Sequence, residues 1–309
     1  MLGIGQEKSN CMPNVSLICT VLNEENSIFS LLQSMSDQTR IPNEVLFVDG
    51  GSTDKTVSKL KKAKKQFPQL NIKIIVQKSN RSEGRNIAIK NAKYESIAIT
   101  DAGCTLDPQW LYELVKKQLQ TGADVIAGYY RAEPKTPFEE AVIPYTLVMP
   151  DRVDPLNFLP ATRSMLISKK AFKKAGGFNS NLNVSEDYEF AHRLKAGAFS
   201  IVFAHEATVV WYPRKTVSSF FTMVASMAAG DAKANVIRPK VYLVFMRYFV
   251  FTSLYFVNFS LLIVLLLIYT FWAIYKNHTY VSVRALPWLG VLQYVADVGV
   301  VLGTLGIIK

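Results

Sequence analysis

The chain has 309 residues, half of them hydrophobic, and a formal net charge of +11. This length accommodates one large domain or two modest ones. The positive balance suits a membrane surface or a phosphate-bearing ligand, but no nucleic-acid module signature is present, so we expect no nucleic-acid partner. The cysteines, Cys11, Cys19 and Cys104, lack the spacing of a metal or redox site and fit a reducing cytosol.

The first 130 residues alternate short apolar runs with helical patterns, which is typical of an α/β domain with a mostly parallel central sheet. Apolar runs predict strands at residues 15–21, 44–48, 72–76, 96–100 and 125–129. Periodic spacing predicts helices at residues 27–37, 53–66, 82–93 and 108–120.

Prolines become frequent after residue 131, and we predict a looped connection there rather than a second domain. Regular patterning returns further on, with strands expected at 165–167, 200–204 and 207–211 and helices at 169–175 and 186–195. The aromatic-rich segment between Pro213 and Lys240 favours either a helix packed on the domain or an amphipathic helix at a membrane surface.

The hydrophobic excess lies at the C-terminus. Residues 249–275 contain no Asp, Glu, Lys or Arg, and a helix of that length would reach roughly 40 Å, enough to cross a hydrocarbon core of about 30 Å. Residues 286–308 are also long enough, but Asp297 leaves a span and an interfacial or re-entrant helix both open. Arg238, Lys240 and Arg247 precede the first span, so we expect the N-terminal domain to face the cytoplasm at the cell membrane.

These observations divide the chain into three parts. Residues 1–212 form the α/β domain, residues 213–247 an interface segment that is helical, and residues 248–309 the membrane anchor.

Polar residues follow several predicted parallel strands at their carboxyl ends, where open α/β sheets bind ligands. Asn23-Glu24 follows the first strand, Asp49 ends the second and Asp101 follows the fourth. One acid in such a place commonly caps the next helix, but capping explains the three acids Glu24, Asp49 and Asp101 less well. The stretch Gly50-Gly51-Ser52 would let a ligand approach the backbone closely.

These residue types suit a nucleotide-sugar transferase. Carboxylate and amide groups hydrogen-bond a base and a ribose, and a carboxylate can hold Mg²⁺ or Mn²⁺ against a diphosphate. A separate carboxylate must take the proton of an acceptor hydroxyl. Arg81, Arg85 and Arg214 are candidates to offset the charge of the leaving diphosphate, although each also fits an ordinary surface position.

Four stretches carry a resemblance to a known family: Val-Ser-Leu-Ile-Cys-Thr-Val-Leu-Asn-Glu-Glu-Asn (15–26), Val-Asp-Gly-Gly-Ser-Thr-Asp (48–54), Gly-Arg-Asn-Ile-Ala (84–88) and Ser-Glu-Asp-Tyr-Glu-Phe-Ala-His-Arg-Leu (185–194). They resemble the nucleotide loop, the V-D-D/G-G-S-x-D stretch, the A/G-R-N element and the E-D helix of family 2 inverting glycosyltransferases, which have the GT-A fold. The resemblance covers about residues 14–215.

The resemblance implies a set of donor contacts. Glu24 and Asp49, with Asn23 beside them, would contact the nucleoside. Arg85 would approach the diphosphate, and Arg214, in the stretch Trp-Tyr-Pro-Arg (211–214), would meet it as it leaves.

The resemblance also implies the catalytic groups and one departure from the family. Asp187 would be the general base, with Glu186 supporting it, and Asp101 would take the first position of the D-x-D motif. Gly103 replaces the second acid of that motif. Either Asp101 and the diphosphate hold the divalent cation together with a further ligand such as His205, or metal dependence is weaker.

The acceptor stays open between a lipid-linked sugar, a polyprenyl phosphate and a surface polysaccharide. The lack of a Q-x-x-R-W segment argues against a processive synthase. Two rival classes are a nucleotidyltransferase, which needs a glycine-rich basic loop where this chain has Asn23-Glu24-Glu25-Asn26, and a membrane scaffold that has lost its chemistry. One or two spans are too few for a transporter.

Overall fold

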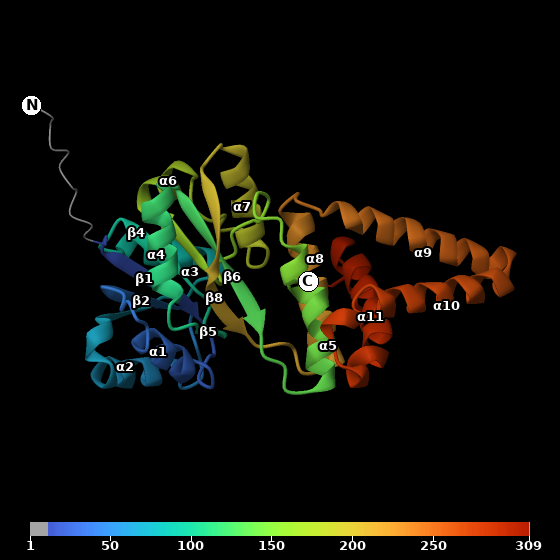
Figure 1. Ribbon diagram of the computed structural model, residues 1–309, viewed down its shortest axis with the longest axis horizontal. Helices are drawn as coiled ribbons and strands as arrows, with labels where there is room; N and C mark the ends of the chain where they lie inside the picture. Colours follow the sequence, from blue (N-terminus) through green and yellow to red (C-terminus); the bar gives the residue numbers. More distant parts are fainter. Residues whose placement is uncertain (1–11, 309) are drawn as a thin grey trace, which may run out of the picture.

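The computed structural model describes residues 12–308, and an eight-stranded sheet lies at its centre (Figure 1). The strands are β1 (Val15–Val21), β2 (Glu44–Asp49), β3 (Ile72–Val76), β4 (Ser96–Ile99), β5 (Cys104–Leu106), β6 (Val125–Ala132), β7 (Met165–Ser168) and β8 (Ile201–Trp211), in the order β3-β2-β1-β4-β7-β6-β8-β5. Strands β1 to β4 pair in parallel, as do β6 and β8, whereas β7 and β5 pair antiparallel with their neighbours. The predicted mostly parallel α/β sheet is confirmed.

Helices cover both faces of this sheet, which is why its central strands read as continuous apolar runs. Alternate residues of β1 serve the two faces: Leu17 belongs to one buried cluster and Ile18 to the other. The Leu17 face is covered by α1 (Ile28–Ser36), α2 (Thr56–Gln66) and α4 (Trp110–Thr121), and the Ile18 face by α3 (Arg81–Asn91), α6 (Lys169–Lys174) and α7 (Glu186–Ala196). Short 3₁₀ turns occupy Pro68–Leu70, Pro150–Arg152, His278–Tyr280 and Val283–Ala285.

The connection after β6 contains a helix where the sequence predicted a loop. Helix α5 spans Pro137–Thr146 and begins at Thr136, whose side chain accepts a hydrogen bond from the Glu139 amide. Pro137 stands in the first turn, where a missing amide proton costs nothing. The high proline count therefore concealed a helix.

Strand β5 was not predicted either. The two strands expected at 200–204 and 207–211 form the single strand β8, with a register shift opposite Gly128 and Tyr129.

The C-terminal part consists of α8 (Val217–Lys233), α9 (Pro239–Val257), α10 (Phe259–Tyr275) and α11 (Leu286–Thr304). In Figure 1, α9 and α10 project away from the sheet as a hairpin, and α11 lies between the base of the hairpin and α8. The prediction of one continuous span over 249–275 is wrong, because the chain turns at Asn258. The Asn258 side chain accepts a hydrogen bond from the Leu261 amide and caps α10.

Three helical segments in residues 12–308 are long and apolar enough to cross a membrane: Pro239–Val257, Phe259–Tyr280 and Val283–Thr304. Helix α8 packs on the domain, with Phe220 fully buried in its core. Of the two interpretations of the segment after Pro213, the structure supports domain packing.

Candidate active site

A cleft of about 530 Å³ opens at the carboxyl ends of β1, β2 and β4. Its walls combine loop backbone, two acids and three arginines. The lining residues that matter below are Glu24, Gly50, Arg81, Asp101, Cys104, Arg163 and Arg214.

The loops after β1 and β2 are tied together on one side of the cleft. The Asn23 amide donates to Ser52 Oγ across 2.8 Å, and Asn23 Oδ1 accepts from the Thr53 amide across 2.9 Å. Asn23 has a left-handed φ of 55°, a conformation that Asn tolerates better than most residues. Asn23 and Ser52, both predicted donor contacts, thus hold the loop that presents Glu24 to the cleft.

The Asp49 side chain fixes the conformation of the loop after β2 by hydrogen bonds to its backbone. It is 1% exposed, and its Oδ1 accepts hydrogen bonds from the amides of Gly51 (3.0 Å) and Ser52 (2.9 Å). Gly50, and not Asp49, lines the cleft. Gly51 has φ +107°, which L side chains rarely adopt. A residue with a side chain at position 51 would therefore strain this turn. The predicted contact between Asp49 and the nucleoside stays a prediction.

Arg85 lies beneath the cleft and connects two acids. Its side chain is 1% exposed, with Nη2 2.7 Å from Asp101 Oδ1 and Nη1 hydrogen-bonded to Glu186 Oε1. Both amino groups are engaged by carboxylates, and the predicted approach of Arg85 to the diphosphate stays a prediction. Burial acts to raise the pKa of Asp101, but the charges of Arg85, Arg81 and Arg163 outweigh it and hold that pKa below its ordinary value.

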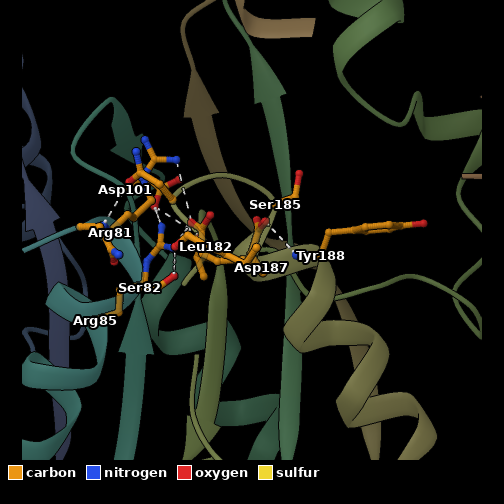
Figure 2. A network of polar contacts seen from close by, with 12 residues as sticks. Arg81, Ser82, Arg85, Asp101, Leu182, Ser185, Asp187 and Tyr188 are labelled. Atoms are coloured by element: carbon orange, nitrogen blue, oxygen red, sulfur yellow. Dashed lines mark hydrogen bonds and ion pairs between the residues drawn. The ribbon is translucent and has the colours of Figure 1, made fainter. Parts of the chain in front are cut away.

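Asp187 lies next to this network, at the start of α7. Figure 2 shows the polar contacts that link Arg81, Arg85 and Asp101 to the segment from Leu182 to Tyr188, where Asp187 lies. Asp187 is half-buried, and its Oδ1 accepts from the Tyr188 amide across 2.8 Å. It is not among the residues that line the cleft. Asp187 is thus connected to Asp101 through its neighbour Glu186 and through Arg85, while Glu24 and Asp101 line the cleft.

Three arginines give the cleft a positive wall. Arg81 is 53% exposed, and its Nη1 lies 3.9 Å from Glu186 Oε1. Neither Arg163 nor Arg214 has a carboxylate within 4 Å in residues 12–308. The pKa of Arg214 is lowered by burial and by the repulsion of Arg163 and Arg81. Cations held together in this way bind an anion strongly.

Sequence reasoning missed Arg163. It lies in the connection where no motif was recognised, and the Thr100 hydroxyl fixes it beside Asp101 by donating to the Arg163 carbonyl across 3.0 Å. Its guanidinium lies 5.2 Å from the centre of the Trp211 ring. A lone arginine without a pattern around it offers no sequence signal for this placement.

His205 is not brought to the cleft. It is exposed on β8, and its ring stacks on Tyr129 with 5.1 Å between centroids. A Cβ added at Gly103 would meet no atom within 4 Å, so open space occupies the place of the missing acid. Within residues 12–308 no group of three or more His, Cys, Asp or Glu side chains is arranged to hold a metal ion. The carboxylates among the cleft-lining residues are those of Glu24 and Asp101.

Two thiols lie close to the site. Cys104 lines the cleft, and burial together with the Asp101 charge raises its pKa to about 12. Burial also raises the pKa of Cys19 well above its ordinary value. Cys11 lies outside the described residues.

The sequence profile of glycosyl transferase family 2 matches residues 16–176. Glycosyltransferase AglE of Haloferax volcanii is 25% identical over 203 residues, which are 64% of this chain and 66% of that protein. The succinoglycan biosynthesis protein ExoA of Rhizobium meliloti is 24% identical over 229 residues, 70% of this chain and 68% of that protein. The chain thus spans about two thirds of these relatives.

Solved structures show the same fold. The mannosyltransferase PcManGT from Pyrobaculum calidifontis, in complex with GDP-Man and Mn²⁺, superposes with a TM-score of 0.70 at 16% identity, covering 97% of this chain and 89% of that chain. S. aureus TarS 1–349 with UDP-GlcNAc gives 0.55 at 19% identity, covering 95% and 91%. The fold is that of a GT-A type domain. The chain belongs to glycosyl transferase family 2.

Proposed function

We propose that this chain is a membrane-anchored inverting glycosyltransferase that moves a sugar from a nucleotide-sugar donor to a lipid-linked or surface-glycan acceptor. The observation that carries the proposal is one cleft in which Glu24, Asp101 and three arginines face a common space, with Asp187 connected to Asp101 through Glu186 and Arg85. An inactive scaffold would have no need to keep three arginines together beside one space.

We assign each part of the donor to the cleft residues whose charge suits it. Glu24 and the loop amides around Gly50 receive the nucleoside, while Arg81, Arg163 and Arg214 receive the diphosphate and offset the charge that it gains as it leaves. Asp187 takes the proton of the acceptor hydroxyl, whose oxygen attacks the anomeric carbon. The bond between that carbon and the diphosphate breaks on the opposite side, which inverts the configuration.

We also propose a divalent cation to which the protein itself would contribute few ligands. PcManGT is described in complex with GDP-Man and Mn²⁺. In this chain a Mg²⁺ or Mn²⁺ ion would take a ligand from Asp101 and the remaining ligands from the diphosphate and water, because His205 lies elsewhere. Such an ion would add to the charge that the arginines supply.

The acceptor and the location follow from the C-terminal helices. Three apolar helices long enough to cross a membrane support a membrane location, and ExoA is named for the biosynthesis of a polysaccharide. We propose a hydroxyl or phosphate of a lipid-linked or growing glycan as the acceptor. Arg238, Lys240 and Arg247 near the start of α9 favour a cytoplasmic catalytic domain.

The test is to present the purified full chain with a panel of nucleotide sugars, with and without Mn²⁺, and to record release of nucleoside diphosphate. We expect release from one donor class, and Mn²⁺ binding that tightens when nucleoside diphosphate is present. The absence of release from every donor, with acceptor glycolipids supplied, would favour the inactive scaffold. Release of inorganic pyrophosphate would instead point to a nucleotidyltransferase.

A further inference from the structure

The three apolar C-terminal helices differ in how much of their surface the protein covers. In α9 the buried side chains are Val241 and Val244, and in α10 they are Leu262, Tyr269 and Ala273. In α11 the buried residues form a stripe along the helix: Leu289, Gly290, Leu292, Gln293, Asp297, Gly299 and Gly303. Protein therefore lines α11 along its length, whereas α9 and α10 are mostly uncovered.

Helix α11 is fixed to the catalytic domain by close backbone contact. A Cβ added at Gly303 would lie 2.1 Å from the Ala225 carbonyl oxygen of α8. Near the other end of α11, the Tyr145 hydroxyl of α5 donates to the Leu289 carbonyl across 2.5 Å. In Figure 1, α11 runs across the base of the hairpin and not along it. A bilayer that receives the hairpin would therefore meet α11 at its surface.

A charged junction joins the three helices at one level. Asp297 of α11 accepts hydrogen bonds from Arg247 of α9 across 2.8 Å, from Tyr269 of α10 across 2.6 Å and from Gln293 across 2.9 Å. Ionised side chains are costly at the centre of a bilayer. This junction therefore marks the level at which the hydrocarbon region begins.

Beyond the junction the hairpin has no charge. Residues 248–268, which we name the hairpin tip, contain no Asp, Glu, Lys or Arg. Ten residues lie on each side of Asn258, so at about 1.5 Å per residue the tip reaches about 15 Å, half of a hydrocarbon core of about 30 Å. Its exposed large side chains are Phe249, Val250, Tyr255, Phe256, Val257, Phe259, Leu261, Ile263, Val264, Leu267 and Ile268.

The turn itself suits an apolar solvent. The Asn258 amide donates to the Leu254 carbonyl across 2.9 Å, its carbonyl accepts from the Leu262 amide across 3.2 Å, and its side chain caps the Leu261 amide across 3.0 Å. Backbone polar groups inside hydrocarbon must be satisfied internally. At the other end of the hairpin, Lys240 and Lys276 suit anionic headgroups.

We propose that the α9–α10 hairpin enters one leaflet of a lipid bilayer to about its midplane and returns, while α11 lies along the membrane surface and does not cross. This deepens the membrane anchoring of the proposed function and does not depend on sugar transfer. Both ends of the hairpin, and the catalytic cleft, then lie on one side of the membrane.

Depth-dependent fluorescence quenching tests this arrangement. In a Cys11→Ser background, Ser260→Cys at the tip and Val298→Cys on α11 are each labelled with a fluorescent maleimide, and the full chain is reconstituted in phosphatidylcholine–phosphatidylglycerol vesicles. Lipids carry a nitroxide near the headgroup or near the end of the acyl chain. We expect the deep nitroxide to quench the Ser260→Cys label several-fold more, and the shallow nitroxide to quench the Val298→Cys label more.

Two results would overturn the proposal. Stronger shallow quenching at Ser260→Cys would place the tip in a headgroup region, as in a hairpin that crosses, and stronger deep quenching at Val298→Cys would show that α11 crosses. Val291→Cys, on another exposed position of α11, replaces Val298→Cys if that variant does not fold. Release of nucleoside diphosphate by each labelled chain in detergent is measured separately, so loss of transfer with the expected depths would count against the proposed function alone.

Discussion

Arg85 and Glu186 are 101 positions apart in the sequence and form an ion pair in which each side chain is at most 2% exposed. The same guanidinium holds Asp101 across 2.7 Å. Arg85 thus positions two acids: Asp101, and Glu186, which stands beside the proposed base Asp187. We therefore expect the catalytic geometry to depend on this bridge.

Arg85→Met should lower both stability and activity. Removing one partner of a buried ion pair leaves the other charge unpaired and costs about 3–5 kcal/mol. We expect a lower midpoint of thermal unfolding and a fall in kcat that exceeds any change in KM for the donor. Adding Glu186→Leu to Arg85→Met should recover part of the stability but not the activity. Full activity in the single variant would contradict the positioning role.

Arg163→Ala and Arg214→Ala should weaken binding of nucleoside diphosphate. A hydrogen bond to a charged group contributes about 1.5–3 kcal/mol, which is roughly a 10- to 100-fold change in Kd. Titration calorimetry with the diphosphate at low and high salt measures this. Arg131→Ala is the matched control, since Arg131 is 49% exposed and pairs with Glu133 away from the cleft. Equal losses in all three variants would argue against a specific diphosphate site.

Cys104 should be nearly inert at neutral pH although it lines the cleft. With its pKa raised to about 12, roughly one thiol in 10,000 is ionised at pH 8, and the thiolate is the reacting form. In the Cys11→Ser variant, we expect slow reaction with a disulfide reagent at pH 8 and about a tenfold gain per pH unit above it. Cys104→Ala should remove this phase. A fast stoichiometric reaction at pH 8 would show that Cys104 has an ordinary pKa.

Asp101 should contribute to stability at neutral pH and lose that contribution in acid. Because its pKa is lowered in the folded chain, folding favours the ionised form. The contribution is complete above the unfolded pKa of about 4 and disappears as the pH falls through the lower folded value. Thermal midpoints of the native chain and of Asp101→Asn, measured from pH 7 to pH 3, should converge as the pH falls. A gap that stays constant over this range would exclude the linkage.

The sequence predicted the parts of the site that local patterns encode. Strands β1 and β2 are buried apolar runs that end in polar loops, so their bounds and the position of Asp49 followed directly. The helix that begins at Glu186 was predicted from its regular helical pattern. Which acids meet depends on the crossover order of the sheet, and the resemblance to the family supplied that information.

The features that the sequence did not predict depend on contacts between residues far apart in the chain. Arg85 shares a helix face with Ala88 and Ile89, which are buried, but an arginine on an apolar face gives no sign of its two carboxylate partners. Arg163 gains its place from Thr100, which directly follows β4 and lies 63 positions away in the sequence. The turn at Asn258 interrupts an apolar run whose composition is equally suited to one long helix, so only the fold distinguishes a hairpin from a span.

The role of Asp187 is the central claim, and Asp187→Asn tests it most directly. A general base contributes typically about 10²- to 10⁴-fold to the rate, and the amide cannot take the proton. We expect transfer to fall by at least about 10²-fold while the Kd for nucleoside diphosphate stays within about twofold, with Glu189→Gln on the same helix as the control. Transfer near the native rate in Asp187→Asn, with diphosphate binding unchanged, would contradict the account.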